Sequence, residues 1–119
     1  MTAGIWPWEI EQGSDFEAEL TLFTKPPNPQ PMMLTGYRAR AQIRPSYGTG
    51  TAVLYELTTE NGRFTIDGPA GKIKISIPAE DSSAWMWLEG VYDLELISPT
   101  GRPTRLLKGP VTVDPEVTR

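Results

Sequence analysis

Residues 72–96 read KIKISIPAEDSSAWMWLEGVYDLEL, and this stretch decides the fold of the chain. Apolar side chains alternate with polar ones at both of its ends, a period of two that predicts two half-buried β-strands. The crossover between them, residues 79–88, carries two tryptophans. We expect it to hold one helical turn, because Asp81 and Ser82 are residue types that cap helix N-termini.

The second strand of the stretch begins with Gly90 and, two residues later, Tyr92. A glycine in this position before a tyrosine, early in a late strand, is the sequence form of a tyrosine corner. In that motif the phenol hydrogen-bonds to nearby backbone and fixes the crossover between two sheets. Gly90 and Tyr92 are therefore the predicted structural corner of an immunoglobulin-like sandwich.

Period-two alternation continues through the rest of the chain, and long helical periodicity is absent from it. Pro7 interrupts the first strand and indicates a sheet edge, while Asn61 and Gly62 predict a tight hairpin turn. We expect an all-β, immunoglobulin-like antiparallel β-sandwich of 7–8 strands. It forms one domain over residues 1–114, followed by a C-terminal tail at 115–119. The predicted strands are 5–10, 16–22, 37–44, 52–57, 63–67, 73–77, 92–96 and 104–113.

The last strand breaks its own alternation once. Leu106 and Leu107 are adjacent, so only one of them can follow the inward phase of Val111. We expect a β-bulge at Gly109 and Pro110 to restore that phase.

Composition excludes several kinds of site. The 119 residues contain no cysteine and no histidine, which excludes disulfides, zinc–thiolate sites and thiol nucleophiles. A net charge of −4 argues against a nucleic-acid partner, and no apolar run approaches the roughly 20 residues that span a bilayer. No calcium-loop, phosphate-loop or nucleophile motif is present, so we expect no cofactor, no metal and no enzymatic activity. Spacing alone leaves open a pair of carboxylates that converge from distant strands.

Four tryptophans are the candidate partner-binding residues. Trp85 and Trp87 lie in the crossover, where a large ring is expected to seal one end of the core. Trp6 and Trp8 lie beside Pro7 at a predicted edge and are the better candidates for a protein interface. Packing, a protein interface and stacking on sugar rings all remain open. A carbohydrate-binding module with exposed tryptophans is the alternative function.

Arg38, Arg40 and Arg44 form an outward stripe on one predicted strand. If this strand neighbours residues 92–96, Asp93 and Glu95 project from the same face and neutralise much of the stripe. We therefore expect cross-strand ion pairs here, in preference to a phosphate-binding face.

Short phrases over nearly the whole chain form an ordered set: QGSDF (12–16), LTGYRAR (34–40), NGRF (61–64), GKI (71–73), IPA (77–79), GVYDLEL (90–96), LLKGPV (106–111) and PEVTR (115–119). This set resembles small immunoglobulin-like proteins encoded in tailed bacteriophages and prophages among tail or baseplate genes. It is also similar to the N-terminal domain of baseplate upper proteins. The chain departs from them in a proline-rich loop, residues 25–31, and in the Trp85–Trp87 crossover.

The resemblance implies a non-enzymatic structural or assembly role, exercised through protein–protein contacts. The implied partners are other phage structural proteins, with a possible homo-oligomer. The implied locations are the virion, or the bacterial host cytoplasm during assembly. The resemblance carries over no catalytic residues.

Overall fold

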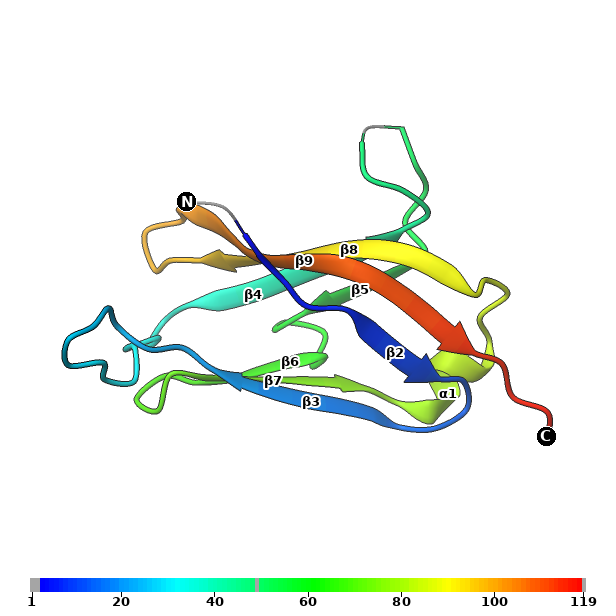
Figure 1. Ribbon diagram of the computed structural model, residues 1–119, viewed down its shortest axis with the longest axis horizontal. Coiled ribbons are helices and arrows are strands. Elements are labelled where there is room, and N and C mark those ends of the chain that lie inside the picture. The colour runs from blue at the N-terminus through cyan, green and yellow to red at the C-terminus, as the bar shows by residue number, and fades with distance from the viewer. Residues whose placement is uncertain (1–2, 49, 119) are drawn as a thin grey trace.

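The computed structural model describes residues 3–48 and 50–118 and shows two β-sheets packed face to face (Figure 1). Each predicted strand segment overlaps an observed strand, and the all-β sandwich is confirmed. The elements of the described residues are β1 (Gly4–Ile5), β2 (Trp8–Glu11), β3 (Phe16–Thr21), β4 (Arg38–Arg44), β5 (Tyr55–Thr58), β6 (Phe64–Asp67), β7 (Lys72–Ile77), α1 (Ala79–Ser83), β8 (Glu89–Ile97) and β9 (Pro103–Asp114).

The larger sheet has the order β1-β9-β8-β4-β5, with β2 also paired to β9, and the smaller sheet has the order β3-β7-β6. Alternate side chains from both sheets meet in the space between the layers, as period-two alternation requires. The fully buried positions include Ile43 and Leu94 from the larger sheet and Ile73, Ile75 and Ile77 from the smaller one. The chain passes between the sheets at residues 59–63, so the turn at Asn61 and Gly62 joins β5 to β6 in different sheets and forms no two-stranded hairpin.

The sheet edge at the amino terminus differs from the expectation. Pro7 does interrupt the first strand, but both halves, β1 and β2, pair with β9 in parallel. The larger sheet is therefore mixed, and the expectation of a wholly antiparallel sandwich is corrected. The cause is the path of the chain, which enters the sheet beside β9 at its edge and runs in the same direction as β9.

The bulge in β9 also differs from the expectation. Leu94 pairs with Leu107 while the next residue, Glu95, pairs with Arg105, which leaves Leu106 as the extra residue. Gly109 stays in register opposite Tyr92. The prediction of a bulge at Gly109 and Pro110 was wrong, because the inserted residue is one of the two adjacent leucines.

Tyr92 makes a longer connection than a tyrosine corner would. Its side chain is 1% exposed, and its hydroxyl donates a 2.6 Å hydrogen bond to the Trp6 carbonyl, 86 residues away in sequence. The phenol thus connects β8 to the linker between β1 and β2. The expectation of a hydrogen bond to backbone near the crossover was wrong. Gly90 has a separate reason to be glycine, since a Cβ there would lie 3.0 Å from the Arg44 carbonyl oxygen.

The helical turn predicted in the crossover is confirmed as α1, but its cap is not the predicted one. Pro78 occupies the N-cap position and provides no side-chain hydrogen bond. Instead, the Asp15 carboxylate accepts a 2.9 Å hydrogen bond from the Ala79 amide. Ser82 is fully buried, and its hydroxyl accepts a 2.9 Å hydrogen bond from the Gly13 amide. The turn before β3 therefore supports the helix from outside.

Candidate functional site

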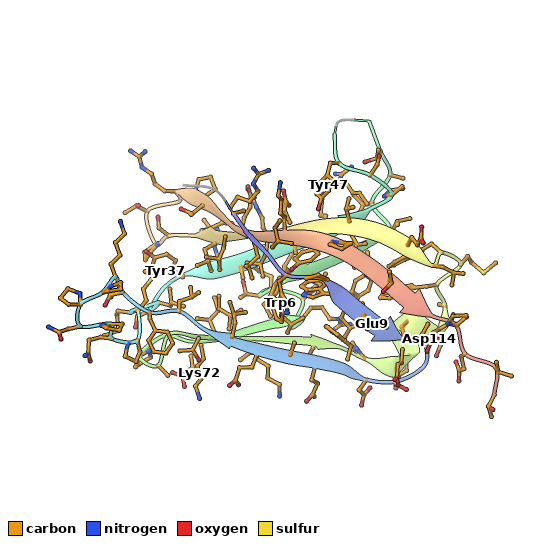
Figure 2. The ribbon with its side chains drawn as sticks, in the orientation of Figure 1. Trp6, Glu9, Tyr37, Tyr47, Lys72 and Asp114 are labelled. Carbon is orange, nitrogen blue, oxygen red and sulfur yellow. The ribbon has the colours of Figure 1, made fainter. Side chains whose placement is uncertain are left out.

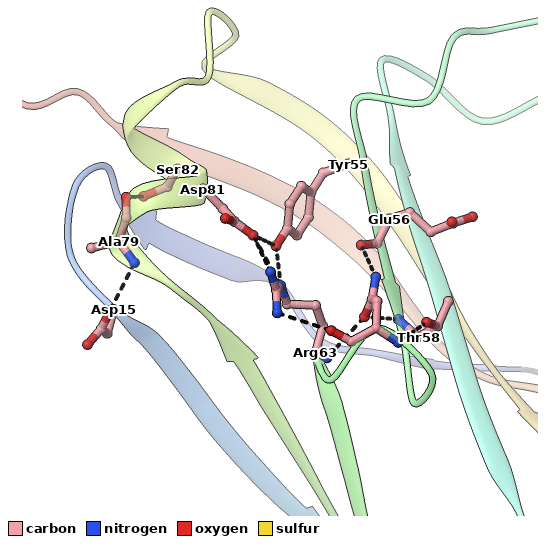
Figure 3. Close-up of polar contacts among 9 residues, drawn as sticks. Asp15, Tyr55, Glu56, Thr58, Arg63, Ala79, Asp81 and Ser82 are labelled. Carbon is pink, nitrogen blue, oxygen red and sulfur yellow. Dashed lines mark hydrogen bonds and ion pairs between the residues drawn. The ribbon is translucent and has the colours of Figure 1, made fainter.

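Three polar side chains meet at the end of the sandwich that carries α1 (Figure 3). Tyr55 comes from the edge strand β5, Arg63 from the connection before β6, and Asp81 from α1. The Tyr55 hydroxyl donates to Asp81 Oδ2 at 2.5 Å, and Arg63 donates to Asp81 Oδ2 at 2.8 Å and to the Tyr55 hydroxyl at 2.8 Å. These contacts tie both sheets to the helix. Sequence reasoning considered Asp81 only as a helix cap and missed this cluster, because its members are remote in sequence.

The cluster changes the acidity of its members in a consistent way. Burial, followed by the hydrogen bond to Asp81, raises the pKa of Tyr55 to about 12. The hydrogen bond from Tyr55, with help from Arg63, lowers the pKa of Asp81. At neutral pH the carboxylate is ionised and the phenol is neutral, which is the state that all three hydrogen bonds require.

The ionisation of Tyr55 predicts a loss of stability in alkali. Its folded pKa of about 12 lies above the ordinary value of 10.0, so its contribution is fully present below pH 10. That contribution is lost as the pH rises from about 10 towards 12. We expect chemical denaturation to give a free energy of unfolding that falls faster over this range in the native chain than in Tyr55→Phe.

Tyr92, whose pKa burial also raises, is present in both proteins and cancels in this comparison. Equal pH dependence of the native chain and Tyr55→Phe would contradict the assignment. The lowered pKa of Asp81 acts at the other limit, because its contribution is present above about pH 4 and is lost as the pH falls further.

An aromatic cluster lies directly beside these polar groups. The Tyr55 ring meets Trp85 edge-on at 5.0 Å, and Trp85 stacks on Trp87 at 4.6 Å. Both indoles are partly buried and pack against the core. Packing therefore explains much of this pair, as expected for a crossover that closes the sandwich, and each of the two rings covers one face of the other.

The residues next to the indoles point outward. Met86 is 97% exposed and Leu88 is 52% exposed, so the alternation of the crossover leaves the tryptophans partly buried and presents these apolar side chains. The C-terminal tail lies nearby, since Gln12 donates to the Trp85 carbonyl at 3.1 Å and accepts from the Glu116 amide at 2.9 Å. Val117, in this tail, is 94% exposed. We call residues 84–88 together with Val117 the tryptophan end.

Carboxylates gather on the larger sheet beside the tryptophan end. Glu9 and Glu89 flank Thr112 from either side, and Glu11 lies next to Asp114. Figure 2 shows Glu9 and Asp114 together near this end of the molecule. None of these four carboxylates has an ion-pair partner among the described residues. The apolar tryptophan end therefore lies beside a group of negative charges.

The amino-terminal tryptophans have separate positions. Trp8 is 2% exposed, stacks on Tyr92 at 3.7 Å and approaches Phe16 at 6.0 Å. It is a core residue, and its selection as a partner-binding residue is corrected because the fold leaves almost none of it accessible. Trp6 meets Trp8 edge-on at 6.1 Å and is partly buried against the core.

The arginine stripe is paired as predicted for one member. Arg40 contacts Glu95 at 2.7 Å across β4 and β8. Asp93 instead pairs with Arg105 at 3.9 Å. Arg44 donates to Gln42 and to the Thr51 carbonyl. Arg38 pairs with Glu60 at 3.6 Å, so all three arginines of the stripe have partners within the protein.

An open groove lies on the same face, beneath the loop that follows β4. Its volume is about 440 Å³, and its lining includes Gln42, Arg44, Tyr47 and Asp93. Figure 2 shows Tyr47 above the larger sheet, and the Lys108 ammonium lies 5.7 Å from the centre of its ring. Among residues 3–48 and 50–118, no group of three or more Asp or Glu side chains is arranged to hold a metal ion.

No helix in the described part of the chain is long and apolar enough to cross a membrane. Comparison of the chain with models of known protein families and with curated proteins finds no match.

Proposed function

We propose that this chain is a non-catalytic protein–protein interaction module of a tailed phage or prophage, acting in the particle or in its assembly. The observation that carries the proposal is the tryptophan end, where Met86, Leu88 and Val117 are exposed to solvent. Hydrogen bonds from Gln12 hold the backbone of this surface in place. Apolar groups gathered at one place on a surface mark interaction sites, and methionine and aromatic residues are enriched in protein interfaces.

The order of the strands supports an immunoglobulin-like fold as part of this proposal. The order β9-β8-β4-β5 opposite β3-β7-β6 corresponds to the two sheets of such a domain, with β5 as the additional edge strand. The Tyr92 hydroxyl bonds here to the Trp6 carbonyl, in the linker between β1 and β2. Rigid sandwiches of this kind present loops and ends to their partners.

The polar groups near the tryptophan end are consistent with a binding role. Arg63, Asp81 and Tyr55 satisfy one another and hold α1, so they position the crossover that follows it. Gln12 fixes the crossover and the tail through backbone groups. A braced surface loses little conformational entropy when a partner binds, which favours affinity.

The proposal is tested by analysing purified particles from a lysate of cells that carry the gene. We expect mass spectrometry to detect the native chain in mature particles or in assembly intermediates. Met86→Glu/Leu88→Glu should reduce its incorporation by about tenfold or more, since it places charges in the apolar part of the interface.

Ile5→Glu is the matched control, because Ile5 is 72% exposed in β1, which pairs with the middle of β9 at Leu107 and Lys108. All three proteins should unfold with free energies within about 0.5 kcal/mol of one another, as is usual for exposed positions. Absence of the native chain from particles and intermediates would overturn the phage assignment. Equal incorporation of the double variant would overturn the assignment of the surface.

A further inference from the structure

The opposite end of the sandwich carries a second apolar surface. Residues 23–32 form an ordered extension, because Thr24 and Met32 donate 2.8 Å backbone hydrogen bonds to Gln30 and Leu22 respectively. Phe23 and Met33 are 57% and 65% exposed. We call this extension, with its four prolines at 26, 27, 29 and 31 and with Met33, the proline end.

Basic residues surround the proline end. Lys25 lies within the extension, and Arg102 lies in the turn between β8 and β9, which approaches the same end through Pro99 and Gly36. Neither Lys25 nor Arg102 has an ion-pair partner among the described residues. Lys72 begins β7 nearby and is weakly paired with Glu19 at 3.7 Å. Asp67, opposite Lys72 in β6, also has no ion-pair partner in the described part of the chain, and its carboxylate accepts a hydrogen bond from the Ala70 amide. Lys25 and Arg102 together leave the balance of unpaired charge at this end positive.

The two ends lie far apart along the long axis of the molecule, which extends 47 Å. Figure 2 shows Lys72 and Tyr37 towards the proline end, and Glu9 and Asp114 towards the tryptophan end. The molecule thus has an acidic apolar end and a basic apolar end. The match extends beyond charge, because the exposed Met86 and Leu88 lie beside the partly buried rings of Trp85 and Trp87. Proline-rich segments characteristically dock on apolar surfaces that contain aromatic residues.

We propose that the proline end of one copy of this chain docks on the tryptophan end of a second copy. In this arrangement the prolines and Phe23 contact the Trp85–Leu88 crossover, and Lys25 and Arg102 approach the unpaired carboxylates. The contact joins two different surfaces, so it is heterologous and propagates into a filament or closes into a ring.

Charge also disfavours the two symmetric alternatives. Docking of two tryptophan ends would bring the Glu9, Glu11, Glu89 and Asp114 carboxylates of both copies together, and docking of two proline ends would bring together Lys25 and Arg102. The outer face of the larger sheet carries ion pairs within one copy, such as Arg40–Glu95. Paired charges of this kind are typical of a surface that stays in contact with water.

The experiment uses purified full-length protein and two blocked variants. Met86→Glu/Leu88→Glu blocks the tryptophan end, and Phe23→Glu/Lys25→Glu blocks the proline end. We expect the weight-average mass of the native chain to rise with concentration between about 10 μM and 1 mM in sedimentation equilibrium, the range of weak interfaces. Each blocked variant alone should remain monomeric.

Mixing the two variants distinguishes this arrangement from a symmetric one. Each variant retains one functional end, so the mixture should form 1:1 dimers and nothing larger. Raising the salt concentration should weaken association of the native chain, because the contact is partly electrostatic. Ile5→Glu should associate like the native chain, and circular dichroism should show all variants folded.

A native chain that stays monomeric over the whole range, or a mixture that stays monomeric, would overturn the inference. Assembly of either blocked variant alone would also overturn it. The inference rests on the proposed binding surface, but the outcomes are separable. A monomeric chain that is still incorporated into particles defeats only self-association, and a self-associating chain that is absent from particles defeats only the phage assignment.

Discussion

Replacing Trp8 by alanine is expected to lower the free energy of unfolding by about 3–5 kcal/mol, the usual cost of truncating a buried tryptophan. Trp8 is 2% exposed and connects three parts of the core, since it stacks on Tyr92 and contacts Phe16 and Trp6. Its removal leaves a cavity between β2, β3 and β8 that rigid strands cannot close. Thermal denaturation should show a fall in Tm of about 10–20 °C.

Two controls separate burial from aromatic chemistry. Leu88→Ala removes an exposed apolar side chain and should change stability by less than about 0.5 kcal/mol. Trp8→Phe should cost only about 1–2 kcal/mol, because it keeps a ring and removes the Trp8 Nε1 donor, which is buried and has no partner among the described residues. Native-like stability of Trp8→Ala would show that Trp8 lies outside the core.

Gly109→Ala is expected to destabilise the protein by about 2–3 kcal/mol, in the upper part of the range for overpacked sites. A Cβ at Gly109 would lie 2.5 Å from the Trp6 carbonyl oxygen and 2.8 Å from its carbon. Both are backbone atoms, so no change of rotamer relieves the clash. The linker between β1 and β2 must move away, and the hydrogen bond from Tyr92 to Trp6 is lost with it.

Hydrogen exchange localises this effect. In Gly109→Ala the amide protons of β1 and β2 should exchange faster than global unfolding of the variant requires. The amide protons of β7 should exchange only through global unfolding. Tyr92→Phe is the matched control, since it removes only the hydroxyl and should cost about 1–2 kcal/mol. Unchanged exchange at β1 and β2 in Gly109→Ala would contradict the close approach at this point.

Local patterns were sufficient to predict the strands. In β4 and β7, alternation assigned the inward side chains correctly because every residue in a strand faces either the core or the outside. The contact between Arg40 and Glu95 followed from the same reasoning once two strands were assumed to be neighbours. The proline interruption of the first strand was predicted as well, since proline lacks an amide donor.

The candidate site was predicted only in part. The sequence placed Trp85 and Trp87 in a crossover, but it could not show that Met86 and Leu88 would be the exposed members of that run. The Tyr55–Arg63–Asp81 cluster brings together residues from three elements, and no spacing along the chain encodes it. Trp8 was misassigned because a tryptophan beside an edge proline looks the same in sequence whether its ring faces inward or outward.

By itself, the sequence determined the all-β class, the positions of the strands and the short helical turn, because alternation, prolines and turn residues act over a few neighbouring positions. Only the tertiary structure decided that the first strand runs parallel to the last, that Leu106 is the bulged residue and that Tyr92 reaches Trp6. These features depend on which backbone segments meet after the two sheets pack. That choice is made by the collective burial of side chains distant in sequence, which no local pattern records.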